Sequence, residues 1–243
     1  MRFSLNGVIS SDEDAPVYRW FGLQAVCPAD IRQALAGNPA GEPFVLEINS
    51  GGGSVYAGFE MYSLLAGTEC ETRAEVQSIA GSAASVVLMG ADTAAVSPVG
   101  QVMIHLPSCR TEGNQNVHRE SEQMLEAVTD SIIAAYRRKC RGKTSAEALR
   151  RMMENETFLT ARQALDAGLV DEIIGEDSGG GAQPRGVYNA AGALPDIDRL
   201  RAAYREAHSQ GAGASNLDTA AQARARAIAL AEAESQIATM SIM

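Results

Sequence analysis

Hydrophobic and polar positions over residues 1–175 follow two alternating periods. Apolar runs at 44–49 and 72–79 have the length and composition of buried strands. Each run is followed by a segment whose apolar residues recur at helical spacing, and a third short strand is expected over 101–105. Because predicted strands alternate with helices, we predict an α/β fold with a mostly parallel sheet.

The carboxyl ends of these strands are where we expect the functional residues, since sites in parallel sheets gather beyond that edge. A glycine-rich loop follows Asn49, the small-residue segment 79–90 follows the second strand, and the third strand ends on His105. The pattern therefore predicts that a glycine loop, a serine- and alanine-rich turn and a histidine share one edge of the sheet.

The segment 79–90 begins with small residues and continues as an apolar run, which is typical of a sharp turn into a buried helix. A serine at such a junction lies near unpaired backbone N–H groups that favour negative charge, and this suits a nucleophile whose reaction creates an oxyanion. A small-residue packing contact is the alternative. The glycines at 51–53 likewise fit a phosphate cradle or an oxyanion site, but the lysine of phosphate-binding loops is absent.

The remaining segments of this region predict a helical second half. A long helix is expected over 117–141, and a second helix begins at Ser145. Thr160 caps a third helix that ends at Gly168, and 169–174 is predicted as a last strand. One apolar stripe of the long helix is expected to be core or subunit interface; it consists of Met124, Val128, Ile132 and Tyr136.

The composition changes after Gly175. We predict a folded domain at 1–175, a glycine-rich linker at 176–195 and a partly helical or disordered tail at 196–243. A short charged helix is expected within this tail, near 194–208. No internal repeat is evident.

Composition narrows the classes of function. Apolar residues make up 46% of the 243 residues, which is enough for a sizeable core, and the net charge of −10 argues against nucleic acid as the main partner. The four cysteines lack zinc-ligand spacing and are expected to be reduced thiols of a cytoplasmic protein. We find no export signal and no apolar run of membrane-spanning length. No metal or other cofactor is expected.

Four segments carry a family resemblance. Residues 48–58 contain Asn-Ser-Gly-Gly-Gly and are similar to the Asn-Ser-Pro-Gly-Gly motif of Clp-type serine peptidases. Residues 81–85, Gly-Ser-Ala-Ala-Ser, resemble the Gly-x-Ala-Ala-Ser nucleophile motif of that family, and 102–107 resemble its Met-Ile-His-x-Pro motif. Residues 156–160 and 164–171 resemble its last motif, an acid-x-Phe-Leu-Ser sequence followed by Gly-Leu-Val-Asp.

The resemblance implies the Clp-type, crotonase-like fold with a protruding handle helix, and a set of catalytic roles. It places Ser85 as the nucleophile and leaves Ser82 in the variable position of the motif. His105 would be the general base, as serine peptidase chemistry requires. The backbone N–H groups of Gly53 and Val86 would hold the oxyanion.

The acidic member of the triad departs from the family pattern. The family usually has aspartate two residues before the phenylalanine, and Glu156 occupies that position here. Asp171 is the runner-up, although it matches a strand residue outside the triad. The proline of the family's glycine loop is replaced by Gly51, which makes that loop more flexible.

The implied function is a serine endopeptidase that works with or without an unfoldase ATPase and assembles as homo-oligomeric rings, heptameric or double. The resemblance is nearest to the phage and prophage branch of head maturation (prohead) proteases, which cleave scaffold or capsid protein. Such an enzyme would act in the host cytoplasm or the procapsid, with neither nucleic acid nor membrane as partner.

Two alternatives belong to other classes. One is a catalytically inactive, ring-forming assembly factor, and the other is an acyl-CoA enzyme on the same crotonase-like fold. A serine/lysine protease is disfavoured because no lysine occurs between Ser85 and Arg137.

Overall fold

The computed structural model describes residues 1–175 and 197–209. The strands in these residues are β1 (Arg2–Ile9), β2 (Ala25–Val26), β3 (Phe44–Gly53), β4 (Thr72–Gly81), β5 (Thr93–Val96), β6 (Gln101–Ile104), β7 (Thr157–Thr160) and β8 (Glu172–Ile173). The helices are α1 (Ala15–Trp20), α2 (Pro28–Ala36), α3 (Val55–Ala66), α4 (Ala83–Leu88), α5 (Gln115–Cys140), α6 (Ala146–Glu154), α7 (Ala161–Ala167) and α8 (Ile197–Ser209).

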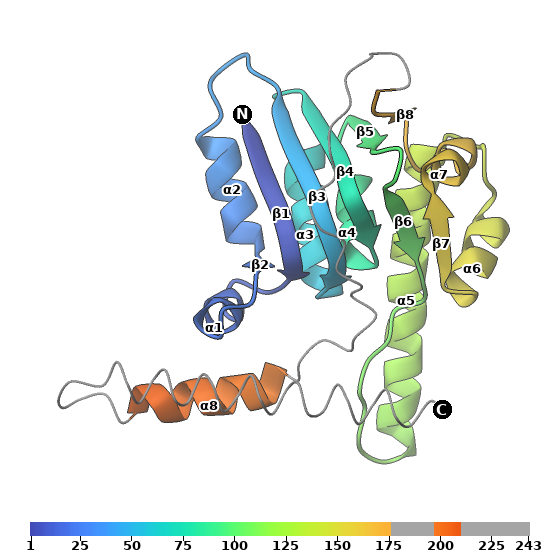
Figure 1. Cartoon of the computed structure of the whole chain (residues 1–243). Coiled ribbons are helices and arrows are strands. Elements are labelled where there is room, and N and C mark those ends of the chain that lie inside the picture. Colours follow the sequence, from blue (N-terminus) through green and yellow to red (C-terminus); the bar gives the residue numbers. More distant parts are fainter. Residues whose placement is uncertain (176–196, 210–243) are drawn as a thin grey trace.

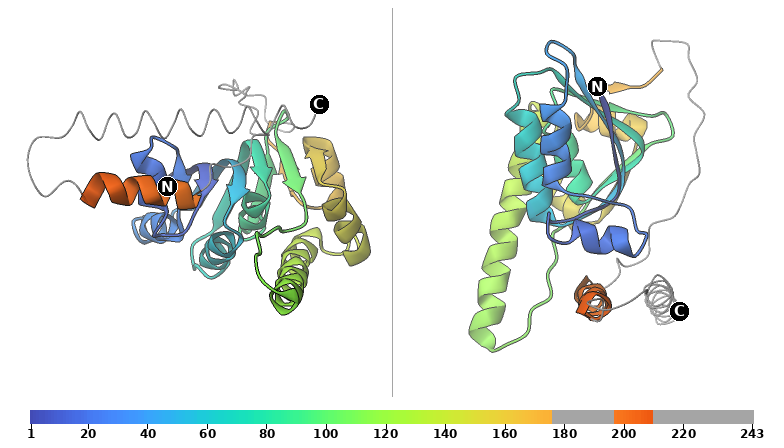
Figure 2. Two further views of the ribbon diagram at one scale, coloured as in Figure 1. Left: turned by 90° about the horizontal axis from the view of Figure 1, so that it is seen from below. Right: turned by 90° about the vertical axis from the view of Figure 1, so that its left-hand side faces the viewer.

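The strands form one sheet with helices packed on one face (Figures 1 and 2). The main path of the sheet runs β2-β1-β3-β4-β5-β8. Beyond the end of β5, β4 pairs instead with β6, and β6 pairs with β7. All of these pairings are parallel except that of β6 with β7. The predicted α/β fold with a mostly parallel sheet is therefore confirmed.

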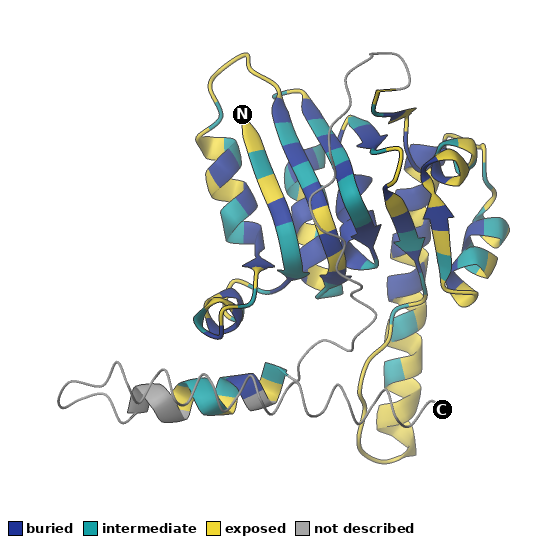
Figure 3. Ribbon diagram, in the orientation of Figure 1, coloured by how far each residue is buried: buried dark blue, intermediate teal, exposed yellow. Residues whose placement is uncertain are grey.

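The two faces of the sheet differ in polarity, and Figure 3 shows the alternation of buried and less buried residues along β1, β3 and β4. Phe44, Leu46 and Ile48 of β3 are completely buried against the helices. The opposite face carries ion pairs that cross the strands, such as Arg2 with Glu47. The helical layer thus holds the core, and the other face of these strands is polar.

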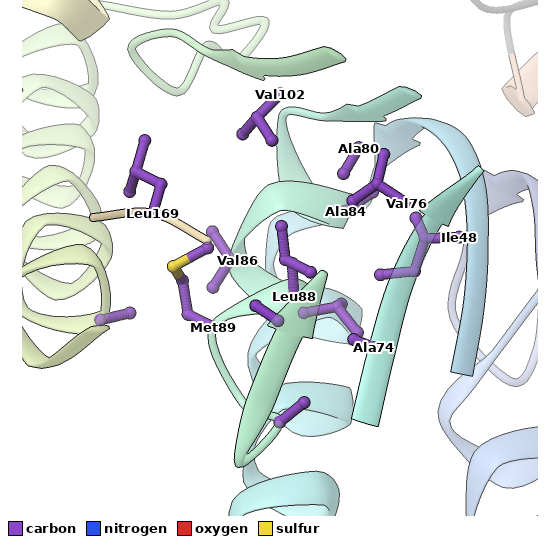
Figure 4. Close-up of a cluster of buried hydrophobic side chains, with 14 of the residues drawn as sticks. Ile48, Ala74, Val76, Ala80, Ala84, Val86, Leu88, Met89, Val102 and Leu169 are labelled. Atoms are coloured by element: carbon purple, nitrogen blue, oxygen red, sulfur yellow. The ribbon is translucent and has the colours of Figure 1, made fainter. Parts of the chain in front are cut away.

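The core lies between the central strands and α4 (Figure 4). The small residues at the start of α4 allow this packing, because a Cβ atom added to Gly58 of α3 would meet Ala83 at 3.2 Å. The close-up shows Val86 and Leu88 of α4 among side chains from the strands, including Val76 and Val102. The apolar run after the turn is therefore the buried helix that its sequence predicts.

Two local predictions are wrong, and one strand is missed. Residues 51–53 belong to β3 and are not a separate loop, because β3 continues to Gly53 beside β1. The acidic and polar residues 10–16 predict a loop, but α1 begins at Ala15 with Pro16 in its first turn. Strand β7 was not predicted at all, since its four residues carry no clear alternation.

The tail contains a helix that packs on the domain. Helix α8 agrees with the short charged helix expected near 194–208. It lies beside α1 (Figures 1 and 2), and Leu200 is buried in a second apolar cluster with Val17, Tyr18 and Phe21. The predicted linker at 176–195 and the remainder of the predicted tail, 210–243, lie outside the described residues.

All four cysteines are free thiols, as expected. In the part of the chain that the structure describes, no helix is both long enough and apolar enough to cross a membrane.

Candidate active site

Ser82 occupies the turn between β4 and α4 in a backbone conformation that residues other than glycine rarely adopt. Its φ is +52° and its ψ is −122°. Its N–H donates to the carbonyl of Met103 at 2.9 Å, which ties the turn to β6. A strained residue between a strand and a helix is the geometry that exposes the nucleophile in α/β hydrolases.

The Nε2 atom of His105 lies 2.7 Å from the Oγ atom of Ser82. The sheet explains this contact, because Gly81 at the end of β4 pairs with Met103 of β6. His105 follows directly after β6 and so comes level with the turn at Ser82. Both side chains are partly accessible to solvent. The predicted meeting of a serine and a histidine at this edge is thus observed, but with a different serine.

Ser85 does not contact His105, and the prediction that these two residues pair is wrong. Ser85 is the third residue of α4, is fully buried, and its Oγ donates to the Ser82 carbonyl at 2.5 Å. The same Oγ lies 2.7 Å from the hydroxyl of Tyr136 on α5. The physical reason is that the strand ends one residue before Ser82, so that only the first serine remains in the turn while the helix carries the second into the core.

If Ser82 takes the place of Ser85, one of the predicted oxyanion donors changes as well. The N–H group next to Ser82 belongs to Ala83, whereas Val86 lies a helical turn further on with its side chain in the core (Figure 4). As the first residue of α4, Ala83 has an N–H group with no acceptor inside the helix. The prediction that the Val86 N–H holds the oxyanion depended on Ser85 as the nucleophile, so it does not apply to a site built on Ser82.

The glycines of β3 bring that strand against the turn. A Cβ atom added to Gly52, whose φ is +104°, would lie 2.7 Å from the Ser82 Cβ and 2.9 Å from the Ala83 nitrogen. The N–H of Ser54 donates to the Ile9 carbonyl of β1. Gly53 is paired with Ile9 of β1, and its φ is +147°.

Glu156 lies beside the strand of the histidine. The antiparallel register of β6 and β7 pairs Ile104 with Thr157, so the next pair outward would be His105 and Glu156. Glu156 is exposed and has a φ of +46°. Within the described residues, no hydrogen bond joins its carboxylate to His105.

Asp171 lies far from His105, and its carboxylate already has other partners. It pairs with Lys139 at 2.6 Å, and its carboxylate accepts the N–H of Ala94 at 2.8 Å. Ala94 pairs with Ala74 of β4, whereas the site lies at Gly81 of the same strand. Seven residues at ~3.3 Å each separate the two positions by about 23 Å. Asp171 is therefore too far away to orient His105.

A groove of about 340 Å³ begins directly after His105, between the segment that follows β6 and helix α5. Its apolar lining includes Leu106, Pro107 and Leu125. Leu106 is 36% exposed. Charged side chains such as Glu122, Glu126 and Arg150 also line the groove, and neither Ser82 nor His105 is among its lining residues.

Comparison with known sequences identifies the family. A sequence model described as Clp protease matches residues 33–177, more than half of the chain. The chain belongs to the Clp protease family.

Similar curated proteins share the description ATP-dependent Clp protease proteolytic subunit. That of Deinococcus radiodurans is 30% identical over 130 residues, which cover 52% of this chain and 62% of the relative. Subunit 1 of Chlamydia abortus is 30% identical over 145 residues, 56% of this chain and 72% of the relative. That of Pleurastrum terricola is 27% identical over 135 residues, 55% and 68% respectively.

The sequence did contain a signal for Ser82. The segment Ser-Ala-Ala-Ser holds two serines three residues apart, and the complete Gly-x-Ala-Ala-Ser motif ends on the second of them. A family nucleophile at the end of a strand must lie in the turn, and the first serine follows the last small strand residues, Ala80 and Gly81. The strand boundary would have selected Ser82.

Proposed function

We propose that this member of the Clp protease family is a serine endopeptidase with Ser82 as nucleophile and His105 as general base. The observation that carries the proposal is the 2.7 Å contact between the Ser82 Oγ and the His105 Nε2 on a strained strand-to-helix turn. In the reaction, the Ser82 Oγ attacks the peptide carbonyl while His105 takes its proton. His105 then passes that proton to the leaving amine, and water hydrolyses the acyl-enzyme.

The negative charge that develops on the carbonyl oxygen needs donors next to Ser82. We assign this role to the N–H groups of Ala83, the residue after Ser82 at the start of α4, and of Gly53, which follows the glycine of β3 that packs against Ser82. Fixed N–H donors of this kind stabilise the transition state more than the substrate, and the loss of one typically costs about 10²–10³ in rate.

We assign the acid of the triad to Glu156. Its place opposite His105 in the β6–β7 register supports this role, and the engagement of Asp171 with Lys139 argues against the alternative. A carboxylate here would orient the imidazole and stabilise its protonated form during the attack. Glutamate is one methylene longer than the usual aspartate, and its side chain has to swing toward the imidazole for this contact.

A fluorophosphonate probe tests the nucleophile. We expect the wild-type protein to be labelled at Ser82, labelling to be abolished in Ser82→Ala, and the Ser85→Ala variant to be labelled still. Labelling that survives in Ser82→Ala, or disappears only in Ser85→Ala, would contradict the assignment. A correctly folded protein that is not labelled at all would favour the catalytically inactive alternative. Hydrolysis of acyl-CoA without any label would favour the crotonase-type alternative.

The finer role that we propose is head maturation of a phage or prophage, by a homo-oligomeric ring that cleaves scaffold or capsid protein. The Asn-Gly-x-Ile strand at the N-terminus, the short segment before His105 and the long tail support this branch. The relatives' description as ATP-dependent subunits supports a second possibility, in which an unfoldase ATPase delivers substrates. Co-expression with scaffold and capsid protein, without an ATPase, separates the two possibilities. We expect the wild-type protein to cleave the capsid precursor and the Ser82→Ala variant to leave it uncleaved.

A further inference from the structure

A buried chain of two hydroxyl groups lies directly behind Ser82. The Ser85 Oγ is 2.5 Å from the carbonyl oxygen of Ser82 and 2.7 Å from the Tyr136 hydroxyl. Ser85 is completely buried and Tyr136 is 1% exposed. Neither hydroxyl can therefore be a substrate contact or a nucleophile, and the triad chemistry described above uses neither of them.

The direction of the two hydrogen bonds follows from the chemistry of the groups. A carbonyl oxygen can only accept a hydrogen bond, so the Ser85 hydroxyl donates its single proton to the carbonyl oxygen of Ser82. The contact with Tyr136 must then be donated by the tyrosine. The chain runs from the Tyr136 O–H to the Ser85 Oγ, and from the Ser85 O–H to the Ser82 carbonyl.

The tyrosine remains a donor at all pH values that the folded protein experiences. Burial raises the pKa of the Tyr136 phenol well above its usual range, and the hydrogen bond with Ser85 offsets only part of this effect. The phenol is therefore neutral, and its proton is available to Ser85.

The Ser82 carbonyl, which accepts the last hydrogen bond of this chain, belongs to the same peptide unit as the Ala83 N–H. A peptide unit is planar, so fixing the direction of its C=O also fixes the direction of its N–H. The Ser85 N–H donates to the same carbonyl at 3.0 Å, so both the backbone and the side chain of Ser85 hold this oxygen. This peptide follows a residue with a φ of +52°, which would relax without such restraint.

We propose that Tyr136 and Ser85 are positioning residues that hold the Ser82–Ala83 peptide so that the Ala83 N–H faces the developing oxyanion. The inference rests on the proposed peptidase function. It assigns a catalytic consequence to the second serine of the Ser-Ala-Ala-Ser segment and to one residue of α5. Because the oxyanion exists only in the transition state, loss of the chain should lower kcat and leave KM unchanged.

The test is the steady-state cleavage of a fluorogenic peptide, with the rate of fluorophosphonate labelling as a second measurement. We expect kcat to fall about tenfold in Ser85→Ala and somewhat less in Tyr136→Phe, with KM within twofold of wild type. The double variant should match Ser85→Ala, since the tyrosine acts only through the serine. Tyr136→Phe removes a single oxygen, and so it keeps the proposal testable if Ser85→Ala folds poorly.

Thr72→Val is the matched control. Thr72 is also completely buried, and its hydroxyl donates to Asp92, near the opposite end of β4. This variant should lose stability like Ser85→Ala but keep the wild-type kcat. If Ser85→Ala and Tyr136→Phe lose only stability, as Thr72→Val does, the positioning role is wrong while the peptidase proposal stands. If the wild type is not labelled at Ser82, both proposals fall.

Discussion

At the scale of single residues, the candidate site is built from backbone conformations that L-amino acids disfavour. Among the described residues, three that are not glycine have a positive φ: Ser82, Arg141 and Glu156. Two of these three lie next to the strands that neighbour β6: Ser82 directly follows β4, and Glu156 directly precedes β7. Strain of this kind costs about 1–3 kcal/mol per residue and persists where the surroundings enforce it. Its concentration around one histidine supports a functional site there.

Gly52 is the residue at which this packing is tightest. In Gly52→Ala, the new methyl group would lie 2.7 Å from both the Gly81 carbonyl oxygen and the Ser82 Cβ. The turn at Ser82 has to shift to accept it, and a displacement of about 1 Å at a catalytic group costs about 100-fold in rate. We therefore expect kcat/KM for peptide cleavage to fall at least about 100-fold.

Gly41→Ala provides the control for backbone strain. Gly41 has a φ of +80°, but nothing lies within 4 Å of its added Cβ atom. This variant should lose about 1 kcal/mol of stability and keep full activity. Equal activity of the two variants would show that Gly52 is needed only for its conformation and not for its approach to Ser82.

At the scale of elements, β6 brings the site together through its two different neighbours. Its parallel register with β4 brings His105 to Ser82, and its antiparallel register with β7 brings Glu156 opposite His105. A slip of one residue in either pairing would turn the side chains of β6 or β7 to the opposite face. The position of the acid thus depends on a pairing between strands more than 50 residues apart in sequence.

Two substitutions distinguish the candidate acids. Glu156→Gln should lower kcat by about tenfold to 100-fold, with little effect on the melting temperature, since Glu156 is exposed and its charge would act only on the imidazole. Asp171→Asn should lower stability by about 1–3 kcal/mol, because it leaves Lys139, which is 7% exposed, without its carboxylate partner. Peptide turnover and thermal unfolding of both variants are the measurements. If turnover is lost only in Asp171→Asn and the protein stays folded, Glu156 is not the acid.

At the scale of the whole molecule, the tail is anchored at the carboxyl-edge side of the sheet through α8. Leu200 packs among the apolar residues of α1, and Arg201 pairs with Asp14 at 2.6 Å. Trp20 and Tyr204 add an edge-to-face contact with ring centroids 5.5 Å apart. These contacts form a cluster separate from the main core, so the docking of α8 is expected to be lost without unfolding the domain.

Leu200→Asp should release α8 from α1. A carboxylate at this position would be buried among Val17, Tyr18 and Phe21 without a partner, which is unfavourable by several kcal/mol. We expect faster amide hydrogen exchange in α1 and α8, with unchanged exchange in β3 and β4. The control is Ala202→Asp, which adds the same charge on an exposed position of the same helix. Equal exchange in the two variants would mean that α8 is not held through Leu200.

The Clp motifs of the sequence led to His105, Gly53 and Glu156 as candidates, but not to the serine that contacts this histidine. The motif at 81–85 contains two serines in equivalent surroundings of small residues. Only the end of β4 at Gly81 and the start of α4 at Ala83 decide which serine lies in the turn. Element boundaries are the least certain part of any prediction from periodicity, and the proposed nucleophile lies at such a boundary.

The sequence by itself determined the fold class, because the fold class follows from the periodicity of apolar residues. Apolar runs separated by helical patterns specify parallel strands, and such strands bring their carboxyl ends to one edge. The tertiary structure alone decided what depends on register and on close approach. It joined His105 to Ser82 through β4 and β6, set Glu156 opposite that histidine through an unpredicted strand, and buried Ser85 against Tyr136. These contacts join residues from different strands and helices, and no local pattern records which side chain of an element faces which neighbour.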